Sequence, residues 1–402
     1  MKGADPMAQA KAETTAYREP PAMRFWKVLW GVVFVVGLVG VGQRLLFGHK
    51  LAAYGSYVPW GLWVSAYLYF IGLSAGAFLL SSLAYVFGVR KLERVGRIAL
   101  ITALITLLMA LLSIWFDLGH LERFYYVYIR PNFRSMMAWM VWLYTAYFLL
   151  LAVELWAVLK RPEDARLIRV LGTLGVPLAI AFHGGVGALF ATVVAHPYWH
   201  NPTTPILFLT GALVSGGGLL TAVIAFLYPM PEDERRELTT LMGRIVGGLL
   251  LFDLLLEWAE FSVPLWYGGF GEEVTNLKLV LFGRFWWVFW IVHLLIGSLI
   301  PLALIFGIRK PSAVGLGGLL IAISFLSVRL NIVIPALVTP HIEGLQEAFH
   351  QPRLQFDYVP SLHEWLVLLF IVALGVGLFY GSFKALVQFE SRRAAQGEGG
   401  PA

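Results

Sequence analysis

The chain has 402 residues, of which 59% are hydrophobic and only 13% charged, and its formal net charge is +6. Soluble domains carry roughly 25% charged residues, so this composition excludes an ordinary soluble protein and indicates a polytopic membrane protein. The absence of cysteine excludes disulfides, thiolate catalysis and any iron–sulfur cluster ligated by this chain. Because the Lys and Arg residues are spread in small clusters, they are typical of membrane-topology signals and not of a nucleic-acid site.

Ten apolar segments are long enough to cross a bilayer, which takes about 20 residues in a helix. In chain order they are residues 25–47, 61–88, 95–116, 136–159, 169–195, 204–228, 242–266, 284–308, 313–335 and 361–388. The first follows a polar stretch, residues 1–24, and is too long for the core of a signal peptide, so we expect a retained anchor. The pattern predicts an all-α integral membrane protein with about ten transmembrane helices.

The positive charges are unevenly divided between the two sides that this topology defines. Counted together with the adjoining ends of the spans, the N-terminal tail, the even-numbered connections and the C-terminal tail (residues 389–402) hold 21 Lys and Arg residues, whereas the odd-numbered connections hold 8. Cytoplasmic segments of membrane proteins carry the excess of Lys and Arg. We therefore expect both termini in the cytoplasm and the connection that follows the third span outside.

Two parts of the chain resemble each other. The second span contains "YFIGLSAGAFLLSSL" and the sixth "LFLTGALVSGGGLLTAV", and the third and seventh end in "WFDLGHLERF" and "LFDLLLEWAEF". This similarity predicts two related four-helix bundles, residues 61–195 and 204–335. Residues 25–60 form a first helix and its outer loop, and residues 336–388 form an outer loop and the last helix. Small residues in the repeated spans allow helices to approach closely: Ser74, Gly76, Gly216 and Gly218.

The seventh span carries three carboxylates. Asp253, Glu257 and Glu260 lie at i, i+4 and i+7, which places them on one face of a helix. Ionisable groups inside a bilayer are costly and tend to be paired, hydrated or functional. Such a ladder is typical of a proton relay, and the deeper position of Asp253 favours this function. The alternative is a structural ladder paired with arginines or hydrated near the outer surface.

Several further charged residues lie near the outer ends of spans. We expect them to form one polar pocket beneath the outer face: Asp117, His120, Arg123, Arg284, Arg329 and Glu364. Glu154 differs, because it lies near the cytoplasmic end of the fourth span. It is either a proton-transfer group or a paired or snorkelling side chain.

Histidine positions raise the alternative of a haem. His183 and His293 lie at similar depths in their spans, so two axial histidine ligands are geometrically conceivable. A buried histidine in a membrane is more often hydrogen-bonded, and we expect no haem and a proton-transfer role for His183. The remaining loop histidines are given no role: His49, His200, His341 and His350.

Four segments resemble the NrfD-like polysulfide reductase membrane subunits. They are "YVPWGLWVSAYLYFIGLSAGAFLLSSL", "FDLGHLERFYYVYIRPNFRSMMAWMVWLYTAYFLLLAVEL", "HGGVGALFATVVAHPYWHNPTTPILFLTGALVSG" and "YVPSLHEWLVLL". The resemblance covers residues 54–385, and ten spans bring the chain nearest the long branch of the family, which includes the membrane subunit of a periplasmic uptake hydrogenase and DsrP-type proteins.

The resemblance implies a quinone-reactive subunit in the cytoplasmic (inner) membrane of a prokaryote, without haem or metal. Its substrate would be menaquinone or ubiquinone. Its partners would be an extracytoplasmic four-cluster ferredoxin-like iron–sulfur subunit and a catalytic subunit.

The resemblance also implies a quinone site near the outer face, formed partly by the first helix of the first bundle. In this chain, the positions that match this site are Ser65, Tyr67 and Leu68, and Asp117 and His120 are expected to lie opposite them. Some shorter relatives have Asn and His on that helix, where this chain has Ser65 and Leu68. Because Ser65 and Leu68 differ from the Asn and His of those relatives, we expect Asp117 and His120 to be the catalytic residues.

The residue types at this position suit quinone chemistry. A quinol releases two protons with its two electrons, so its site needs proton acceptors, and Asp117 and His120 lie on neighbouring faces if the helix continues. Arg123 can keep Asp117 ionised, and Trp60 offers a flat aromatic wall. The alternative is a helix-ending loop in which Asp117 caps the helix and Arg123 pairs with Glu122.

We therefore predict a quinone-linked membrane subunit of a multisubunit respiratory oxidoreductase, which is not catalytic alone. A secondary transporter or proton-translocating module is the alternative from another class. The repeat is parallel, since spans two and six run in the same direction, and this weakens the transporter hypothesis. A haem-b anchor is the third hypothesis.

The charge asymmetry gives a direct test of topology. A reporter fused after Ala402 should be active only on the cytoplasmic side, and one inserted within residues 118–135 only on the outer side. Identical sidedness of the two reporters would contradict the predicted number of spans.

Overall fold

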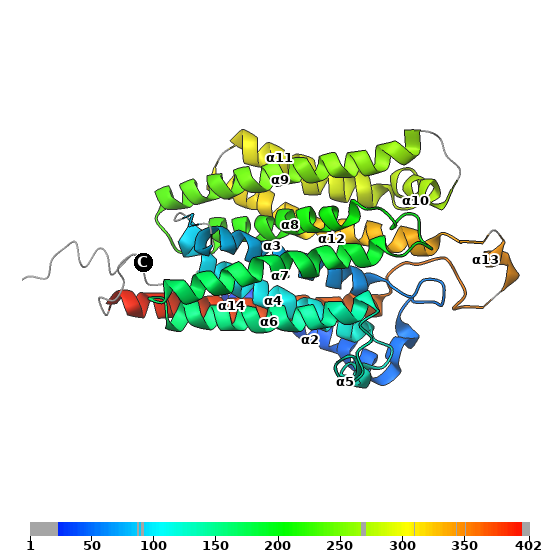
Figure 1. Ribbon diagram of the computed structural model, residues 1–402, viewed down its shortest axis with the longest axis horizontal. Helices are drawn as coiled ribbons and strands as arrows, with labels where there is room; N and C mark the ends of the chain where they lie inside the picture. The colour runs from blue at the N-terminus through cyan, green and yellow to red at the C-terminus, as the bar shows by residue number, and fades with distance from the viewer. Residues whose placement is uncertain are drawn as a thin grey trace, which may run out of the picture.

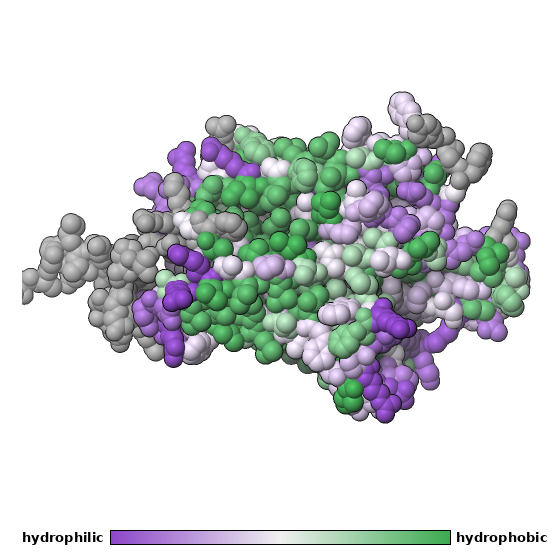
Figure 2. All heavy atoms as spheres, viewed as in Figure 1, coloured by the Kyte–Doolittle hydropathy of each residue, from purple (hydrophilic) through white to green (hydrophobic). Residues whose placement is uncertain are grey.

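The computed structural model describes residues 23–86, 88–89, 92–266, 271–308, 310–342, 344–349 and 351–395. Most of the two predicted tails and His350 lie outside these residues. Within the described part, ten helices are long and apolar enough to cross a membrane. They form an elongated bundle (Figure 1), and apolar side chains dominate the middle of its visible face, between more polar ends (Figure 2). The predicted all-α membrane fold is confirmed.

The membrane-length helices follow the predicted order. They are α2 (Met23–Phe47), α3 (Leu62–Tyr85), α4 (Glu93–Asp117), α6 (Met136–Lys160), α7 (Ala165–Ala191), α8 (Thr204–Phe226), α9 (Glu232–Trp266), a composite eighth helix, α12 (Pro311–Val338) and α14 (Leu362–Ala395). The composite helix consists of η4 (Val288–Leu299) and η5 (Leu304–Ile308), both π-helical, joined by α11 (Ile300–Ala303). The short elements are η1 (Gly48–Leu51), η3 (Leu121–Arg123), α5 (Tyr126–Ile129), α10 (Glu272–Leu281) and α13 (Leu345–Ala348).

Helix α9 begins well before the predicted residue 242. The charged stretch "EDERREL" is part of the helix, although its charge suggested a connection. Pro231 directly precedes Glu232, Asp233 and Glu234, and negative charges in a first turn stabilise a helix by interacting with its dipole. The apolar part of α9 is therefore only its last two-thirds. The polar first turns continue the helix beyond this apolar part, towards residue 232.

The long helices contact one another in three groups. Helices α3, α4, α6 and α7 form one group, and α8, α9, the composite helix and α12 form a second. Helices α2 and α14 pack against each other, and α14 packs on α4. Helix α8 contacts both α3 and α12, so it joins the first two groups. We propose that these two groups are the related bundles 61–195 and 204–335.

The close contact between α3 and α8 depends on glycines, which have no side chain. A Cβ atom on Gly216 would lie 2.6 Å from the backbone nitrogen of Ala77, and one on Gly76 would collide with the carbonyl oxygen of Ala212. On another face of α8, a Cβ on Gly218 would lie 2.7 Å from the carbonyl oxygen of Gly318 in α12. Glycines therefore let α8 approach both neighbours at backbone distance, as the small-residue pattern predicted.

Both described chain ends lie at the same end of the molecule. Trp30 of α2 donates a hydrogen bond of 2.7 Å to the carbonyl of Ala373 in α14, and the Lys27 ammonium lies 5.6 Å from the Tyr380 ring. The start of α2 thus lies beside the second half of α14. We call this the tail end, on the left of Figure 1, and the opposite end, which holds residues 118–135, 192–203, 271–287 and 339–361, the loop end.

The glycine contact predicts a position-specific effect on stability. Gly216→Ala should lower the thermal unfolding temperature in detergent, because overpacking costs about 1–3 kcal/mol. Gly248→Ala is the matched control, since a Cβ there meets nothing within 4 Å. Equal unfolding temperatures for the two variants would contradict the close approach of α3 and α8.

Candidate functional site

A buried arginine organises the first polar cluster, at the loop end of α2 and α4. Arg44 is 2% exposed. Its Nε donates to the carbonyl of Phe116 at 2.8 Å, and its Nη2 donates to the carbonyl of Leu118 at 2.6 Å. These two carbonyls flank Asp117, because α4 ends there and Leu118 adopts an extended conformation. Arg44 thereby holds the end of α4 and interacts electrostatically with the Asp117 carboxylate.

Two tyrosines from segments at the loop end complete what we call the Asp117 cluster: Arg44, Tyr54, Asp117, Tyr358 and Glu364. The Tyr54 hydroxyl lies within hydrogen-bonding range of the Asp117 carboxylate. The Tyr358 hydroxyl donates to Oε1 of Glu364 at 2.9 Å and accepts from the backbone of Leu62 at 2.7 Å. Burial raises the pKa of Tyr54 and of Tyr358 well above the ordinary tyrosine value, so both phenols are neutral hydrogen-bond donors.

Two buried atoms near Arg44 lack hydrogen-bond partners. They are Oδ1 of Asp117 and Nε2 of His363. Nδ1 of His363 lies 3.2 Å from Oε1 of Gln43, an amide oxygen that can only accept, so Nδ1 carries the proton and Nε2 is an acceptor. Buried polar groups are normally satisfied, and an unsatisfied pair of acceptors is well suited to a ligand that brings hydroxyl groups.

The other predicted residues of the 117–123 stretch lie elsewhere. His120 is 63% exposed on its side chain and pairs with Glu122 at 3.0 Å. Arg123 lies 3.7 Å from the same carboxylate, so it pairs with Glu122 and does not hold Asp117. The reason is local, because α4 stops at Asp117 and His120 never continues its helical face. Arg44, and not Arg123 as the sequence suggested, is the arginine that interacts with the Asp117 carboxylate.

The residues predicted on α3 point in different directions. The Ser65 hydroxyl bonds to the carbonyl of Gly61, the Tyr67 hydroxyl bonds to that of Tyr144 in α6, and Leu68 is buried in the core. Trp60 stacks on Trp199, with ring centroids 5.9 Å apart. The side chain of α3 that reaches the Asp117 cluster is instead that of Trp63. Its indole donates to the Glu364 carbonyl at 3.0 Å, and its ring lies 5.8 Å from the Arg44 guanidinium.

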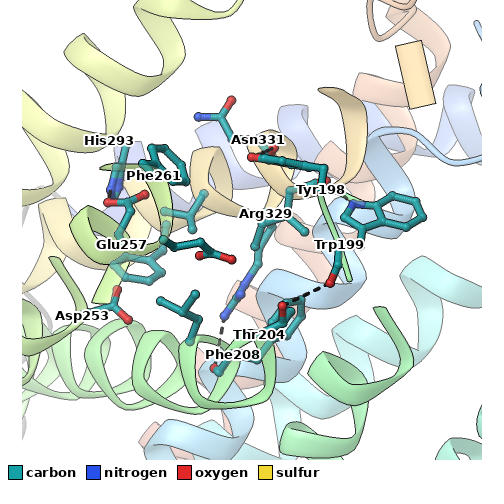
Figure 3. A pocket seen from close by; sticks show the side chains of 15 residues that line it. Tyr198, Trp199, Thr204, Phe208, Asp253, Glu257, Phe261, His293, Arg329 and Asn331 are labelled. Atoms are coloured by element: carbon teal, nitrogen blue, oxygen red, sulfur yellow. Dashed lines mark hydrogen bonds and ion pairs between the residues drawn. The ribbon is translucent and has the colours of Figure 1, made fainter. Parts of the chain in front are cut away.

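A second polar site lies between α8, α9, the composite helix and α12 (Figure 3). We call it the second-bundle pocket. Its cavity of about 60 Å³ has room for a few water molecules. Its polar and aromatic lining includes Tyr198, Trp199, Thr204, Phe208, Asp253, Glu257, Glu260, Phe261, His293, Phe325, Arg329 and Asn331. The predicted ladder of α9 therefore faces one common space.

Each carboxylate of the ladder has its own partner. Asp253 accepts a hydrogen bond of 2.5 Å from Thr210, Glu257 lies 2.8 Å from Nε2 of His293, and Glu260 lies 3.4 Å from the Asn201 amide nitrogen. Their partners come from α8, from η4 and from the loop between α7 and α8. The ladder thus combines an ion pair with neutral hydrogen bonds, a set of groups that can accept and release protons.

Arg329 connects the pocket to the first bundle. Its guanidinium lies 4.4 Å from the centre of the Phe208 ring, and its Nη2 donates to the Phe208 carbonyl at 3.4 Å. Nε2 of His183, from α7, lies 2.7 Å from the same carbonyl oxygen. His183 and Arg329 therefore both lie at hydrogen-bond distance from one carbonyl of α8. Helix α8 is also the helix that joins the two helix groups.

The structure also places Glu154 and the remaining charged residues that the sequence analysis singled out. Glu154 is only 1% exposed, with Oε2 buried and unpartnered, so it lies inside the helix packing and does not snorkel to a surface. The outer charged residues do not form one pocket. Glu364 joins the Asp117 cluster, Arg329 joins the second-bundle pocket, and Arg284 pairs with Asp357 at the surface.

Sequence reasoning missed Arg44, Tyr54, Tyr358 and His363 as members of the first site. One signal for Arg44 was present, because it is a charged residue near the end of an otherwise apolar span, and such residues are usually functional or paired. The two tyrosines and His363 gave no such signal, since tyrosine and histidine are common near membrane interfaces.

Comparison with known proteins identifies relatives along almost the whole chain. A family model described as polysulphide reductase, NrfD, matches residues 50–341. A selenate reductase subunit of Mesobacillus selenatarsenatis is 35% identical over 390 residues, which cover 86% of this chain and 90% of that protein. The Hdr-like menaquinol oxidoreductase integral membrane subunit of Archaeoglobus fulgidus is 28% identical over 376 residues, covering 90% and 93%.

A polysulfide reductase component of Wolinella succinogenes is 27% identical over 302 residues, which cover 69% of this chain and 93% of that protein. The family model begins after α2 and ends before α14. Arg44, Tyr358 and Glu364 therefore come from segments outside the matched range, whereas Tyr54, Asp117 and the second-bundle pocket lie within it.

Proposed function

Because the chain belongs to the NrfD polysulphide reductase family, we propose that it is the quinone-reactive membrane subunit of a multisubunit respiratory oxidoreductase. The names of the relatives support this function, since one is a menaquinol oxidoreductase subunit and others are components of selenate and polysulfide reductases. A subunit of this kind passes electrons between a membrane quinone, menaquinone or ubiquinone, and partner subunits that hold the redox centres.

We propose the Asp117 cluster as the quinone site. The observation that carries this assignment is the buried, unpartnered Oδ1 of Asp117 beside the fixed guanidinium of Arg44. A quinol hydroxyl is a donor that satisfies this oxygen, and Trp63 offers the flat apolar wall that a quinone ring needs. The neutral hydroxyl of Tyr54 then keeps the carboxylate oriented towards the substrate.

The chemistry follows from the proton balance of the reaction. A quinol gives up two electrons and two protons as it becomes a quinone, and the reverse reaction takes them up. We assign one proton to Asp117 and the second to the free Nε2 of His363. Arg44 favours the ionised carboxylate once the proton has left, and His120, exposed three residues beyond Asp117, passes protons to water.

The same proposal assigns sides and partners. With the tail end in the cytoplasm, the Asp117 cluster lies near the outer face of an inner membrane. An extracytoplasmic four-cluster ferredoxin-like iron–sulfur subunit would bind at the loop end and pass electrons to a catalytic subunit. We propose that the chain holds no haem, because Nε2 of His183 and Nε2 of His293 already lie at hydrogen-bond distance from Phe208 and Glu257.

For the second-bundle pocket we propose proton transfer. Ionisable residues around a hydratable cavity inside the membrane are typical of proton pathways. The ladder Asp253, Glu257 and Glu260 would carry protons within the second bundle. His183 and the buried Glu154 are the corresponding groups of the first bundle.

Substitution of Asp117 tests the quinone site. Asp117→Asn keeps the shape of the side chain but removes its base, so quinone-linked turnover should fall by about 10²–10⁴-fold. Activity of the same complex with an artificial dye should stay normal, because dyes exchange electrons with the partner subunits. Glu122→Gln, at an exposed carboxylate five residues away, is the matched control and should leave both activities unchanged.

Assembly is measured in parallel, because the loss of Asp117 also removes a negative charge near buried Arg44. An assembled Asp117→Asn complex with normal quinone turnover would contradict the assignment. His120→Ala should reduce turnover less than Asp117→Asn, since solvent water can replace an exposed proton carrier.

Substitution of Asp253 tests the proton pathway. In proteoliposomes, Asp253→Asn should abolish proton movement linked to turnover while leaving assembly intact, because the amide accepts a hydrogen bond but does not ionise. Glu237→Gln, on an exposed position of the same helix, is the control. Unchanged proton movement in Asp253→Asn would assign the ladder a purely structural role.

A further inference from the structure

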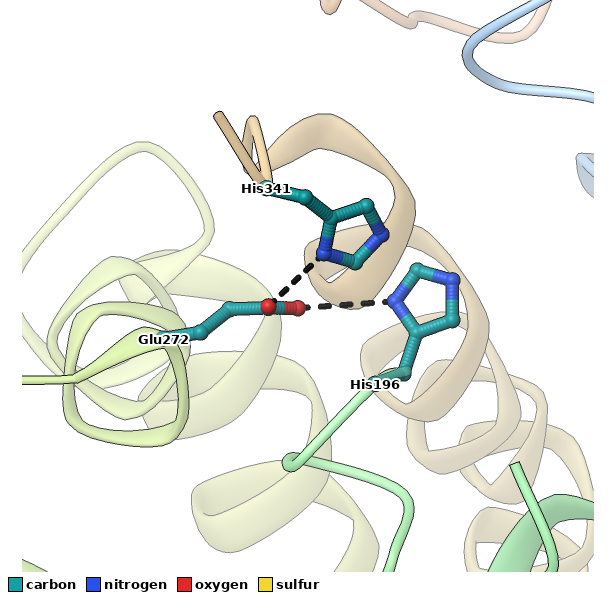
Figure 4. Close-up of side chains that lie close together, drawn as sticks. All are labelled: His196, Glu272 and His341. Carbon is teal, nitrogen blue, oxygen red and sulfur yellow. Dashed lines mark hydrogen bonds and ion pairs between the residues drawn. The ribbon is translucent and has the colours of Figure 1, made fainter. Parts of the chain in front are cut away.

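Three loop-end segments bring together two imidazoles and a carboxylate (Figure 4). His196 follows α7, Glu272 lies in the first turn of α10, and His341 follows α12. Nδ1 of His341 lies 2.8 Å from Oε2 of Glu272, and Nδ1 of His196 lies 3.4 Å from Oε1. Each residue offers one ligand atom, and the three atoms lie within 4.8 Å of one another.

The hydrogen bond between His341 and Glu272 leaves two atoms of this cluster unsatisfied. Nδ1 of His196 and Oε1 of Glu272 are both buried and lie 3.4 Å apart, but neither makes a hydrogen bond of normal geometry. Leaving two such buried atoms unsatisfied costs free energy, because each has lost its hydrogen bonds to water. A cation that accepts electron pairs from both atoms removes this cost, whereas a water molecule would have to donate to both.

The backbone around the cluster is held in place by other contacts. Asn276, one turn after Glu272 in α10, bonds to the hydroxyl of Thr339, two residues before His341. The His196 carbonyl accepts a hydrogen bond of 2.9 Å from the backbone of Trp199, and the two rings pack with centroids 4.3 Å apart. These contacts hold the three backbone segments in place without using the ligand atoms themselves.

We propose that His196, Glu272 and His341 bind a divalent transition-metal ion, for which Zn²⁺ has the fitting chemistry. Two imidazoles and one carboxylate are ligands that suit zinc, and a three-ligand site leaves one position open to water. Zinc–nitrogen bonds of 2.0–2.1 Å place neighbouring ligand atoms about 3.3 Å apart, a separation that fits within the 4.8 Å that encloses the three ligand atoms here. The family resemblance implied a chain without metal, and this proposal departs from that expectation.

Such an ion would tie together three segments that are far apart in the sequence. Trp199, which packs on His196, also lines the second-bundle pocket. A bound metal therefore fixes the loop-end wall of that pocket. The inference does not depend on the proposed quinone chemistry, because it concerns only the ligand atoms.

Metal analysis of the purified full-length chain in its complex tests the site. After treatment with a chelator, incubation with Zn²⁺ and removal of unbound metal, the wild type should retain about one zinc ion per chain in this site. His341→Ala and Glu272→Gln should lose this ion. His200→Ala and Glu273→Gln change neighbouring residues outside the cluster and should retain it.

A second measurement needs no variant. Co²⁺ added to the chelator-treated wild type should give the visible absorption of a four- or five-coordinate site, and Zn²⁺ should displace it. No retained zinc in the wild type, equal zinc in all variants, or no cobalt spectrum would each overturn the proposal and leave a hydrogen-bonded cluster only.

Discussion

The high cost of an isolated charge in a low-dielectric interior governs the arrangement of this protein. Its spans are almost entirely apolar, and the buried ionisable groups are concentrated where several helices meet. Arg44 is held by two carbonyls that flank Asp117, and Arg329 lies on Phe208 near Asp253. Each buried guanidinium thus has a carboxylate in its electrostatic environment, and each pair defines one polar site.

The two sites lie on opposite sides of the tightly packed centre formed by α3 and α8. Glycine contacts let these helices meet at backbone distance, so their positions are firmly fixed relative to each other. His183 and Arg329 meet at the Phe208 carbonyl of α8, which gives a direct polar contact between the two helix groups. The proposed proton pathway in the second-bundle pocket and the proposed quinone site in the Asp117 cluster therefore share one rigid support.

The fold was largely predictable because hydrophobic length is a property of each single segment. The ladder Asp253, Glu257 and Glu260 was also predictable, since residues four and three apart must share a helix face. The composition of the first site was not. Its arginine and one carboxylate come from the first and last long helices, and only tertiary packing brings Arg44 and Glu364 to Asp117. The expected pairing with His120 failed because α4 ends at Asp117.

The central claim is that quinone binds beside Asp117 and not in the second-bundle pocket. A photoreactive quinone analogue, cross-linked to the purified complex and mapped by mass spectrometry of its peptides, tests this claim most directly. The account predicts labels within residues 44–63, 116–118 and 358–364 that are lost when unlabelled quinone competes. Competable labels confined to residues 253–261 and 325–332 would contradict it.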